Sequence, residues 1–289
     1  MQETTIGIMF GLAAMLGFGL GNGFSRPLAR SMGNKQIIFF RTVATSLILL
    51  PVLLFSLPSV RFSALYIIIG FVIAVISYFP LMTFYMALKK SDLGVVCPIA
   101  NSSVIFTVLL SVIFFSERPS IFQYLSIGLI VAGIILISVN FRDIKRSEIL
   151  SLRSGVPFAV ITCILWGIVF FLFKIPVSVI GPILTSFIIE FGIMISSSAH
   201  IVMARERFLF PSKKNMFYIV IVALFSSAGT LFFNMGIDFA DVSVVSAVTM
   251  SNPLVAVIFG RLAYKEKLTR IQWTAVLLVV FGIVLVSLF

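Results

Sequence analysis

Uncharged apolar runs separated by short polar breaks fill this chain from end to end. The run from Ile6 to Phe24 contains no charged residue, and equally apolar runs extend from Ala64 to Leu88 and from Leu93 to Ser116. An α-helix rises about 1.5 Å per residue, so about 20 such residues cross the roughly 30 Å hydrocarbon layer of a membrane. With the polar breaks taken as loops, the pattern predicts about ten membrane spans, at residues 6–25, 36–56, 63–88, 93–115, 121–141, 154–173, 182–203, 215–237, 242–260 and 271–289.

The same runs favour helices over the strands of a membrane β-barrel. Barrel strands alternate lipid-facing and lumen-facing residues over about ten positions. Residues 128–139 show no such alternation: they are continuously apolar, interrupted only by the small residues Gly and Ser. The composition agrees, because a chain that is 60% hydrophobic and 11% charged, with a mean hydropathy of +1.19, has more apolar residues than a soluble core of this length can bury. The sequence therefore predicts an all-α integral membrane protein surrounded by lipid.

A short phrase occurs twice along the chain, around Glu117 and again 149 positions later around Glu266. Residues 114–123 read FFSERPSIFQ and residues 263–272 read AYKEKLTRIQ. The same offset joins further matching positions: Phe84 with Phe233, Asp92 with Asp241, Ser102 with Ser251, Gln123 with Gln272 and Gly133 with Gly282. Such a repeat in an apolar chain indicates a duplicated membrane unit, whose symmetry commonly places a transport site between the halves. We therefore divide the chain into two five-helix repeats, residues 1–148 and 149–289, and expect Glu117 and Glu266 themselves to be structural.

The basic residues of the loops are distributed unevenly between the two sides of the predicted bundle. Each repeat has an odd number of spans, so the second repeat enters the membrane in the opposite orientation to the first. The loops after the odd-numbered spans contain Arg26, Arg30, Lys35, Lys89, Lys90, Arg142, Lys145, Arg146, Arg153, Arg205, Arg207, Lys213, Lys214, Arg261, Lys265, Lys267 and Arg270, while the opposite side has only Arg61, Arg118 and Lys174. Because cytoplasmic loops are enriched in Lys and Arg, we expect an inverted repeat in the cytoplasmic membrane, with both termini on the outer side. This topology accounts for the net charge of +11, and since no aromatic residues interleave the charges, we expect no nucleic-acid partner.

Several short motifs stand at matching places in the two repeats. The second repeat contains Pro253, Glu266, Gln272 and Gly282, and the first has the last three of these at equivalent positions as Glu117, Gln123 and Gly133. Near the start of each repeat, an aromatic residue followed by glycine precedes a basic residue: Phe18-Gly19 with Arg26, and Trp166-Gly167 with Lys174. A further basic residue, Arg41, comes early in span two. In these features the chain resembles the EamA-type transporters of the drug/metabolite transporter superfamily. The resemblance implies a monomer-sized carrier that exports amino acids, other metabolites or drugs through a central cavity lined mainly by the first, third and fourth helices of each repeat. The chain departs from the family pattern at Phe18, which stands in place of Trp, and at Glu190, which stands where the first repeat has Arg41.

Polar side chains within the spans are candidates for binding a small-molecule substrate. When they face a shared interior, such groups supply hydrogen bonds to a small zwitterion or amide. The candidates are Asn22 in span one; Tyr78, Tyr85, Asn101 and Ser102 in spans three and four; and Asn234, Thr249 and Asn252 in the second repeat. Trp166 and Phe170 lie one helical turn apart and form a candidate aromatic wall. The alternative is hydrogen bonding between helices purely for packing, at about 0.6 kcal/mol per contact.

Glu190 is the most informative charged residue, because a carboxylate inside a membrane span is costly. Its neighbours Ile189 and Phe191 are apolar, and apolar surroundings favour the protonated acid. One hypothesis is therefore that Glu190 couples transport to a proton or another cation. The other is an ion pair with Arg41 or Lys174 that holds helices together, since intramembrane charges usually have partners. For Arg41 a structural role is favoured, because it stands near a span end, from which its side chain reaches the headgroups.

The chain carries no sequence signature of an enzyme. A Walker-type nucleotide-binding loop is missing, and the lone histidine, His200, and the two cysteines, Cys97 and Cys163, lack metal-ligand spacing. We therefore expect no enzyme activity, no cofactor and no metal. The preferred interpretation is a secondary transporter, functional as a monomer, that exports small organic metabolites, with amino acids among the candidates, by alternating access around a central cavity. The alternatives are a proton-coupled exporter of cationic drugs and, from another class, a membrane-embedded enzyme or lipid-handling protein.

Overall fold

The computed structural model describes residues 2–138, 154–264 and 269–288, and over these residues the chain forms helices without a β-strand. The first repeat contains α1 (Gln2–Ser31), α2 (Asn34–Ser56), a 3₁₀ turn (Leu57–Ser59), α3 (Ala64–Lys90), α4 (Leu93–Asn101), α5 (Val104–Phe114) and α6 (Ile121–Ser138). The second contains α7 (Val156–Leu172), α8 (Lys174–Ile180), α9 (Pro182–Met203), α10 (Lys213–Phe239), α11 (Val242–Thr249), α12 (Pro253–Tyr264) and α13 (Arg270–Leu288). Within the described part, 8 helical stretches are long and apolar enough to cross a membrane, and two shorter apolar stretches, Ile121–Ile137 and Val242–Ala256, accompany them. The predicted all-α fold of about ten spans is confirmed.

The fourth span of each repeat is broken near its middle. The predicted span at 93–115 is α4 followed by α5, and the predicted span at 242–260 is α11 followed by α12. The breaks include Ser102 and Ser251, which the repeat offset makes equivalent. Pro253 begins α12 because proline has no N–H to donate to the preceding turn. Discontinuous helices at corresponding places in two repeats are typical of substrate sites in transporters.

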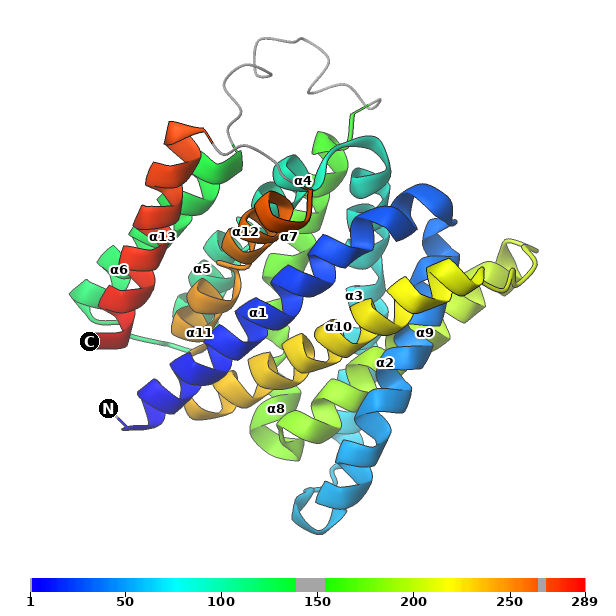
Figure 1. Ribbon diagram of the computed structural model, residues 1–289. Coiled ribbons are helices and arrows are strands. Elements are labelled where there is room, and N and C mark those ends of the chain that lie inside the picture. Colours follow the sequence, from blue (N-terminus) through cyan, green and yellow to red (C-terminus); the bar gives the residue numbers. More distant parts are fainter. Residues whose placement is uncertain (1, 139–153, 265–268, 289) are drawn as a thin grey trace.

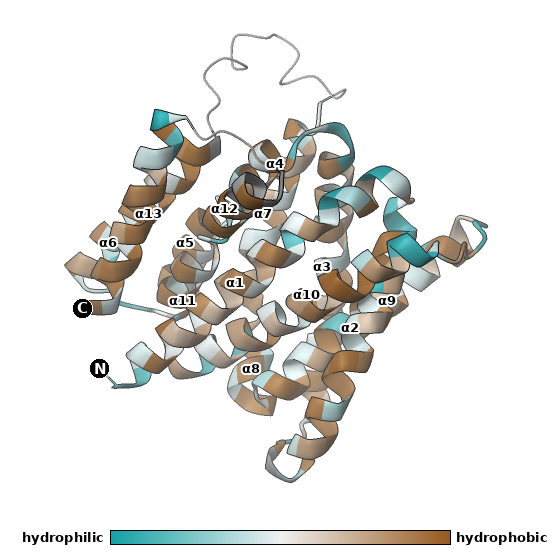
Figure 2. Ribbon diagram, viewed as in Figure 1, coloured by the Kyte–Doolittle hydropathy of each residue, from teal (hydrophilic) through white to brown (hydrophobic). Residues whose placement is uncertain are grey.

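The two repeats run in opposite directions through the bundle (Figure 1). The first helices of the repeats, α1 and α7, point in opposite directions, and α6 and α13 pack together as an antiparallel pair. Figure 2 shows mainly hydrophobic helix surfaces, with hydrophilic residues concentrated where α1 leads into α2 and α3 into α4. We call this the basic end; it contains Arg26, Arg30, Lys35, Lys89 and Lys90. The arrangement is the inverted repeat that the odd number of spans predicts.

The longest contact between the repeats joins α1 to α10 (Figure 1). Phe10 stacks on Phe232 with ring centroids 6.0 Å apart, and Phe24 stacks on Phe225 at 6.1 Å. Between these two aromatic contacts, a β-carbon at Gly17 would lie 2.7 Å from the backbone nitrogen of Gly229, so a larger residue does not fit without movement of the helices. The first helix of the chain is thus held by a helix of the other repeat.

Helices α6 and α13 pack closely at two equivalent glycines, Gly133 of α6 and Gly282 of α13, each of which contacts the other helix. A β-carbon at Gly133 would lie 2.5 Å from Cγ2 of Val279, and one at Gly282 would lie 2.8 Å from Cγ1 of Ile130. The 149-residue offset relates Gly133 to Gly282 and also Ile130 to Val279. The contact therefore lies on the pseudo-two-fold axis that relates the repeats.

Glu117 joins the first repeat to the start of a helix in the second. Its two carboxylate oxygens accept hydrogen bonds from the backbone N–H groups of Val242 (2.7 Å) and Ser243 (3.0 Å). These N–H groups begin α11, where unpaired donors and the helix dipole favour a negative charge. Glu117 is therefore structural, as the sequence predicts, whereas Glu266 lies outside the described residues.

We expect Gly133→Val to lower the stability of the bundle by about 1–3 kcal/mol, the usual cost of overpacking a close contact. The reason is the clash of the added side chain with Val279 and with the backbone oxygen of Ala275. Gly128→Val on the same helix is the matched control, since a β-carbon there meets nothing within 4 Å. Thermal unfolding of the purified protein in detergent measures both, and equal midpoints for the two variants would contradict the axial contact.

Candidate functional site

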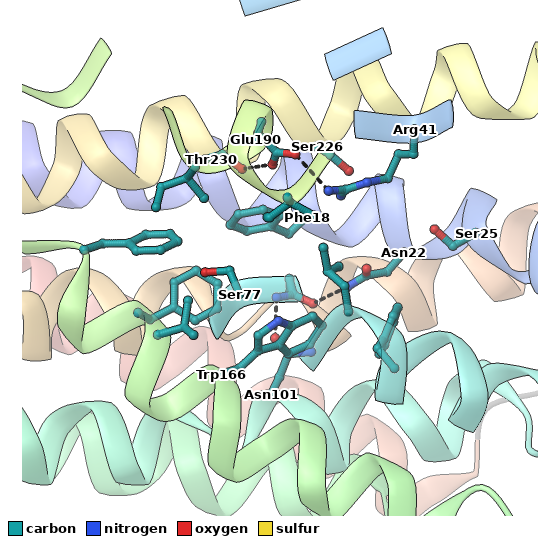
Figure 3. A pocket seen from close by; sticks show the side chains of 18 of the residues that line it. Phe18, Asn22, Ser25, Arg41, Ser77, Asn101, Trp166, Glu190, Ser226 and Thr230 are labelled. Carbon is teal, nitrogen blue, oxygen red and sulfur yellow. Dashed lines mark hydrogen bonds and ion pairs between the residues drawn. The ribbon is translucent and has the colours of Figure 1, made fainter. Parts of the chain in front are cut away.

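A cavity lies between the two repeats and leaves about 70 Å³ for the centres of water-sized molecules (Figure 3). Its polar lining consists of Asn22, Ser25, Arg41, Ser77, Tyr85, Asn101, Glu190, Ser226, Thr230 and Asn252. Its apolar lining consists of Phe18, Leu81, Phe84, Trp166, Val169, Phe170, Phe173, Ile189, Ile193 and Met250. Both repeats contribute to each set, so the site exists only when the two repeats are packed together.

Most lining residues come in pairs that the repeat relates. Between α1 and α7 the offset is 148 residues, because the motif of Phe18 matches that of Trp166. At this offset the lining pairs are Phe18 with Trp166, Asn22 with Phe170 and Ser25 with Phe173. At the offset of 149 residues, which applies to the later helices, the lining pairs are Arg41 with Glu190, Ser77 with Ser226, Leu81 with Thr230 and Asn101 with Met250. The cavity therefore straddles the pseudo-two-fold axis, although the paired residues differ in chemistry.

An ion pair between Arg41 of α2 and Glu190 of α9 crosses the axis at one wall of the cavity. Nη2 of Arg41 lies 2.8 Å from Oε2 of Glu190, and the two side chains are only 7% and 4% exposed. The second carboxylate oxygen, Oε1, accepts a hydrogen bond from Thr230 Oγ1 at 3.0 Å. Nε of Arg41 is buried and has no hydrogen-bond partner among the described residues. Because a charge buried without its partner is costly, this pair holds α2 and α9 together.

Of the two partners that the ion-pair hypothesis considers for Glu190, the structure has Arg41 in contact with it. Arg41 does not extend toward the headgroups, since it is buried and its guanidinium contacts Glu190. Lys174 is placed elsewhere: Nζ donates a hydrogen bond to the backbone oxygen of Ile237 within the second repeat. Lys174 therefore joins α8 to α10, and it does not line the cavity.

Three asparagines form a chain of side-chain amides at the broken helices. Nδ2 of Asn252 donates to Oδ1 of Asn101 at 2.6 Å, and Nδ2 of Asn22 donates to Oδ1 of Asn252 at 3.3 Å. Asn101 ends α4 and donates in turn to the backbone oxygen of Cys97 at 2.8 Å. Asn252 stands in the break before α12. These hydrogen bonds fix the orientation of the three amides, which face the cavity from α1 and from both broken spans.

Aromatic rings cover another part of the cavity wall. Phe170 contacts Trp166 and Phe18 with ring centroids 6.3 Å and 6.0 Å away, and Phe84 of α3 lies 5.0 Å from Trp166. The rings meet in tilted or edge-to-face orientations, which aromatic pairs prefer. The cavity thus combines an apolar aromatic wall, an amide chain and one neutral ion pair.

Several residues predicted to bind substrate do line this cavity, namely Asn22, Tyr85, Asn101, Trp166, Phe170 and Asn252. The structure places Tyr78, Ser102, Asn234 and Thr249 outside it, in contacts between or within helices. Their hydroxyl or amide groups are bonded to His200 Nδ1 (2.6 Å), Pro98 O (3.0 Å), Ser186 Oγ (2.8 Å) and Gly11 O (3.3 Å) respectively. Hydrogen bonds of this kind, within a helix or between helices, are the ones that the packing alternative describes.

Four polar lining residues were not among those predicted from the sequence: Ser25, Ser77, Ser226 and Thr230. The repeat offset identifies Ser77 and Ser226, because the same residue occupies both equivalent positions. Helical spacing identifies the other two, since Ser25 is three residues after Asn22 on α1 and Thr230 is four residues after Ser226 on α10. Offset and spacing together therefore locate a site that residue type alone does not.

Inverted repeats around a central cavity, with broken helices beside it, recur in membrane transporters. The chain belongs to the EamA-like transporter family, whose model matches residues 5–139 and 153–288. It is accordingly a multi-pass membrane protein of a family of transporters.

The chain is also similar to individual proteins. The chain is 25% identical over 214 residues to an uncharacterized transporter of Synechocystis sp., a match that covers 72% of this chain but only 62% of that protein. An uncharacterized protein of Methanocaldococcus jannaschii is 30% identical over 135 residues, which are 46% of this chain and 96% of that protein. That relative is therefore about one repeat long. A solved crystal structure has the same fold, with a TM-score of 0.75 at 15% identity over 98% of this chain and 96% of the other.

We expect Arg41→Gln or Glu190→Gln to destabilise the protein by about 3–5 kcal/mol, because each leaves one buried charge without its partner. The double variant Arg41→Glu with Glu190→Arg exchanges the two charges between equivalent positions and should recover most of that loss. Thermal unfolding in detergent compares the three variants with the parent protein. Midpoints for the exchanged pair no higher than those of the single variants would contradict a stabilising ion pair.

Proposed function

We propose that this protein is a secondary transporter that exports small organic metabolites, amino acids among them, across the cytoplasmic membrane by alternating access. The observation that carries the proposal is the cavity on the pseudo-two-fold axis, with lining residues paired between inverted repeats. In such a geometry, rocking of one repeat against the other opens a fixed central site to each side in turn. The basic end faces the cytoplasm in this proposal, because Lys and Arg are enriched in cytoplasmic loops.

The chemistry of the cavity suits a small solute with both polar and apolar parts. The amides of Asn22 and Asn252 offer hydrogen bonds, and the rings of Trp166 and Phe170 offer an apolar surface. A water molecule needs about 10–15 Å³ of such space, so about 70 Å³ accommodates only a few groups of that size in this conformation. We infer that the substrate is a compact metabolite, and that larger solutes require the repeats to separate.

A single copy of the chain supplies both halves of the cavity. The pairs that line it, such as Ser77 and Ser226, come from the two repeats of one polypeptide. The relative that is about one repeat long lacks such a second half within its own chain. We therefore propose that this protein transports as a monomer in the lipid bilayer.

A proton-coupled exporter of cationic drugs is the second candidate, because Glu190 lines the cavity. The contact with Arg41 weighs against it: the carboxylate already has a positive partner 2.8 Å away, so a proton or a cationic solute has to displace that partner. We therefore place metabolite export first.

Vesicles containing the purified protein and loaded with a mixture of small metabolites test the transport function. Release is followed by mass spectrometry over time and over a range of loading concentrations, with protein-free vesicles as the reference. We expect saturable release of one class of compound. The absence of any solute movement beyond the protein-free rate would contradict the proposal.

We further expect Asn252→Ala to raise the concentration needed for half-maximal release roughly tenfold. The substitution removes an amide that faces the cavity, and a substrate that loses one hydrogen bond of about 0.5–1.5 kcal/mol binds up to about tenfold more weakly. Asn215→Ala is the matched control, because Asn215 is a partly buried residue near the start of α10 that accepts a hydrogen bond from Ser31 at 3.1 Å and does not line the cavity. An equal effect of the two substitutions would show that the amide chain does not act on the substrate.

A further inference from the structure

We propose that Arg41 and Glu190 set the charge specificity of the cavity. The two residues remain paired as one neutral unit in both access states, and they select solutes whose own charges sum to zero. This inference rests on the proposed transport function and assigns a role to two particular residues of its site.

The described lining of the cavity contains one positive and one negative side chain. Of the residues described in its lining, Arg41 and Glu190 alone carry full charges, and they lie 2.8 Å apart. The remaining polar lining consists of hydroxyl and amide groups, such as Ser77, Ser226 and Asn252. The cavity therefore has no net charge, but it has a strong local dipole along the guanidinium–carboxylate contact.

The ion pair lies on the pseudo-two-fold axis that relates the repeats. If the two repeats exchange conformations as the protein opens to the other side, position 41 takes the place of position 190 and position 190 takes the place of position 41. The separation of two equivalent positions is therefore unchanged by the exchange. Arg41 and Glu190 are 149 residues apart and satisfy this condition.

An ion pair away from the axis shows the contrast. Lys35 Nζ lies 2.6 Å from Glu206 Oε1 at the basic end. The offset relates these positions to Leu184 and Leu57, two apolar residues at the opposite end of the bundle. Exchange of conformations therefore alters the Lys35–Glu206 contact but leaves the Arg41–Glu190 contact in place.

The charges of the lining affect the free energy of a solute that enters the cavity. A solute with a net charge gives up hydration when it enters, and it finds no uncompensated opposite charge in the lining. A zwitterion can place its two charges antiparallel to the guanidinium–carboxylate dipole, and an uncharged solute loses less hydration. Both kinds of neutral solute are therefore favoured over a cation or an anion of the same size.

Substitution of one partner should change this preference in a direction set by the remaining charge. Vesicles are loaded with a metabolite mixture that includes leucine as a zwitterion, leucinamide as a cation and N-acetylleucine as an anion, which share one side chain. The parent protein should release neutral solutes. Arg41→Gln leaves the carboxylate and should shift the release ratio toward cations by about tenfold or more, while Glu190→Gln should shift it toward anions by a similar factor.

Further variants separate charge from folding. Ser77→Asp adds a negative charge to the lining while the ion pair stays intact, so it should shift release in the same direction as Arg41→Gln even where that variant does not fold. The exchanged pair, Arg41→Glu with Glu190→Arg, should keep the preference for neutral solutes. The control is Lys35→Gln with Glu206→Gln, which removes an ion pair that does not line the cavity and should leave the charge profile unchanged.

The direction of transport provides a second readout. Uptake into empty vesicles and release from loaded ones should have the same charge profile, because the pair is intact in both access states. Folded Ser77→Asp and Glu190→Gln proteins with the charge profile of the parent would overturn the inference while leaving transport itself established. A protein that moves none of the mixture would instead overturn the proposed function, and this inference with it.

Discussion

The ion pair between Arg41 and Glu190 is the constraint around which the cavity is arranged. Either charge buried alone inside the bundle would be costly. Helices α2 and α9 therefore pack so that Arg41 and Glu190 are in contact. The duplication brought two copies of one ancestral position face to face on the axis. Identical charges there would repel, and opposite charges attract. The pair therefore requires repeats that have diverged in sequence, because two identical single-repeat chains would present the same residue from both sides.

Divergence also explains why a symmetric backbone encloses an asymmetric site. The broken spans α4–α5 and α11–α12 place equivalent turns beside the cavity, yet Asn101 faces it from one repeat and Met250 from the other. Asn22 and Ser25 on α1 correspond to Phe170 and Phe173 on α7. The first repeat thus supplies two of the three amides, Asn22 and Asn101, whereas each repeat supplies three of the aromatic rings. The duplication positions the site, and later substitution gives equivalent positions different chemistry.

Much of the fold could be predicted from the sequence, because lipid demands long apolar helices and the repeat offset is visible in the residues around Glu117 and Glu266. Pro98 and Pro253 indicate a kink in each of the two spans that contain Ser102 and Ser251. That each helix ends there and a second one begins was not predicted, since both runs are apolar enough to be one span. For the site, residue type identified Asn22 and Asn252 but did not exclude Tyr78 or Thr249, because facing direction depends on how each helix is rotated in the bundle. The partner of Glu190 was likewise undecided between Arg41 and Lys174: charge shows that a partner is needed, and only packing determines which cation is within reach.

The contact between α1 and α10 has a consequence for how the chain is made. Gly17 packs against Gly229, which is 229 − 17 = 212 residues later in the chain. The ribosome adds residues at about 5–20 per second, so roughly 10–40 s pass before α1 meets its partner. During that time the glycine-rich face of α1 is covered by lipid or by earlier neighbours from its own repeat. Assembly of the bundle is therefore completed late in synthesis, when the helix that entered the membrane first closes against one of the last.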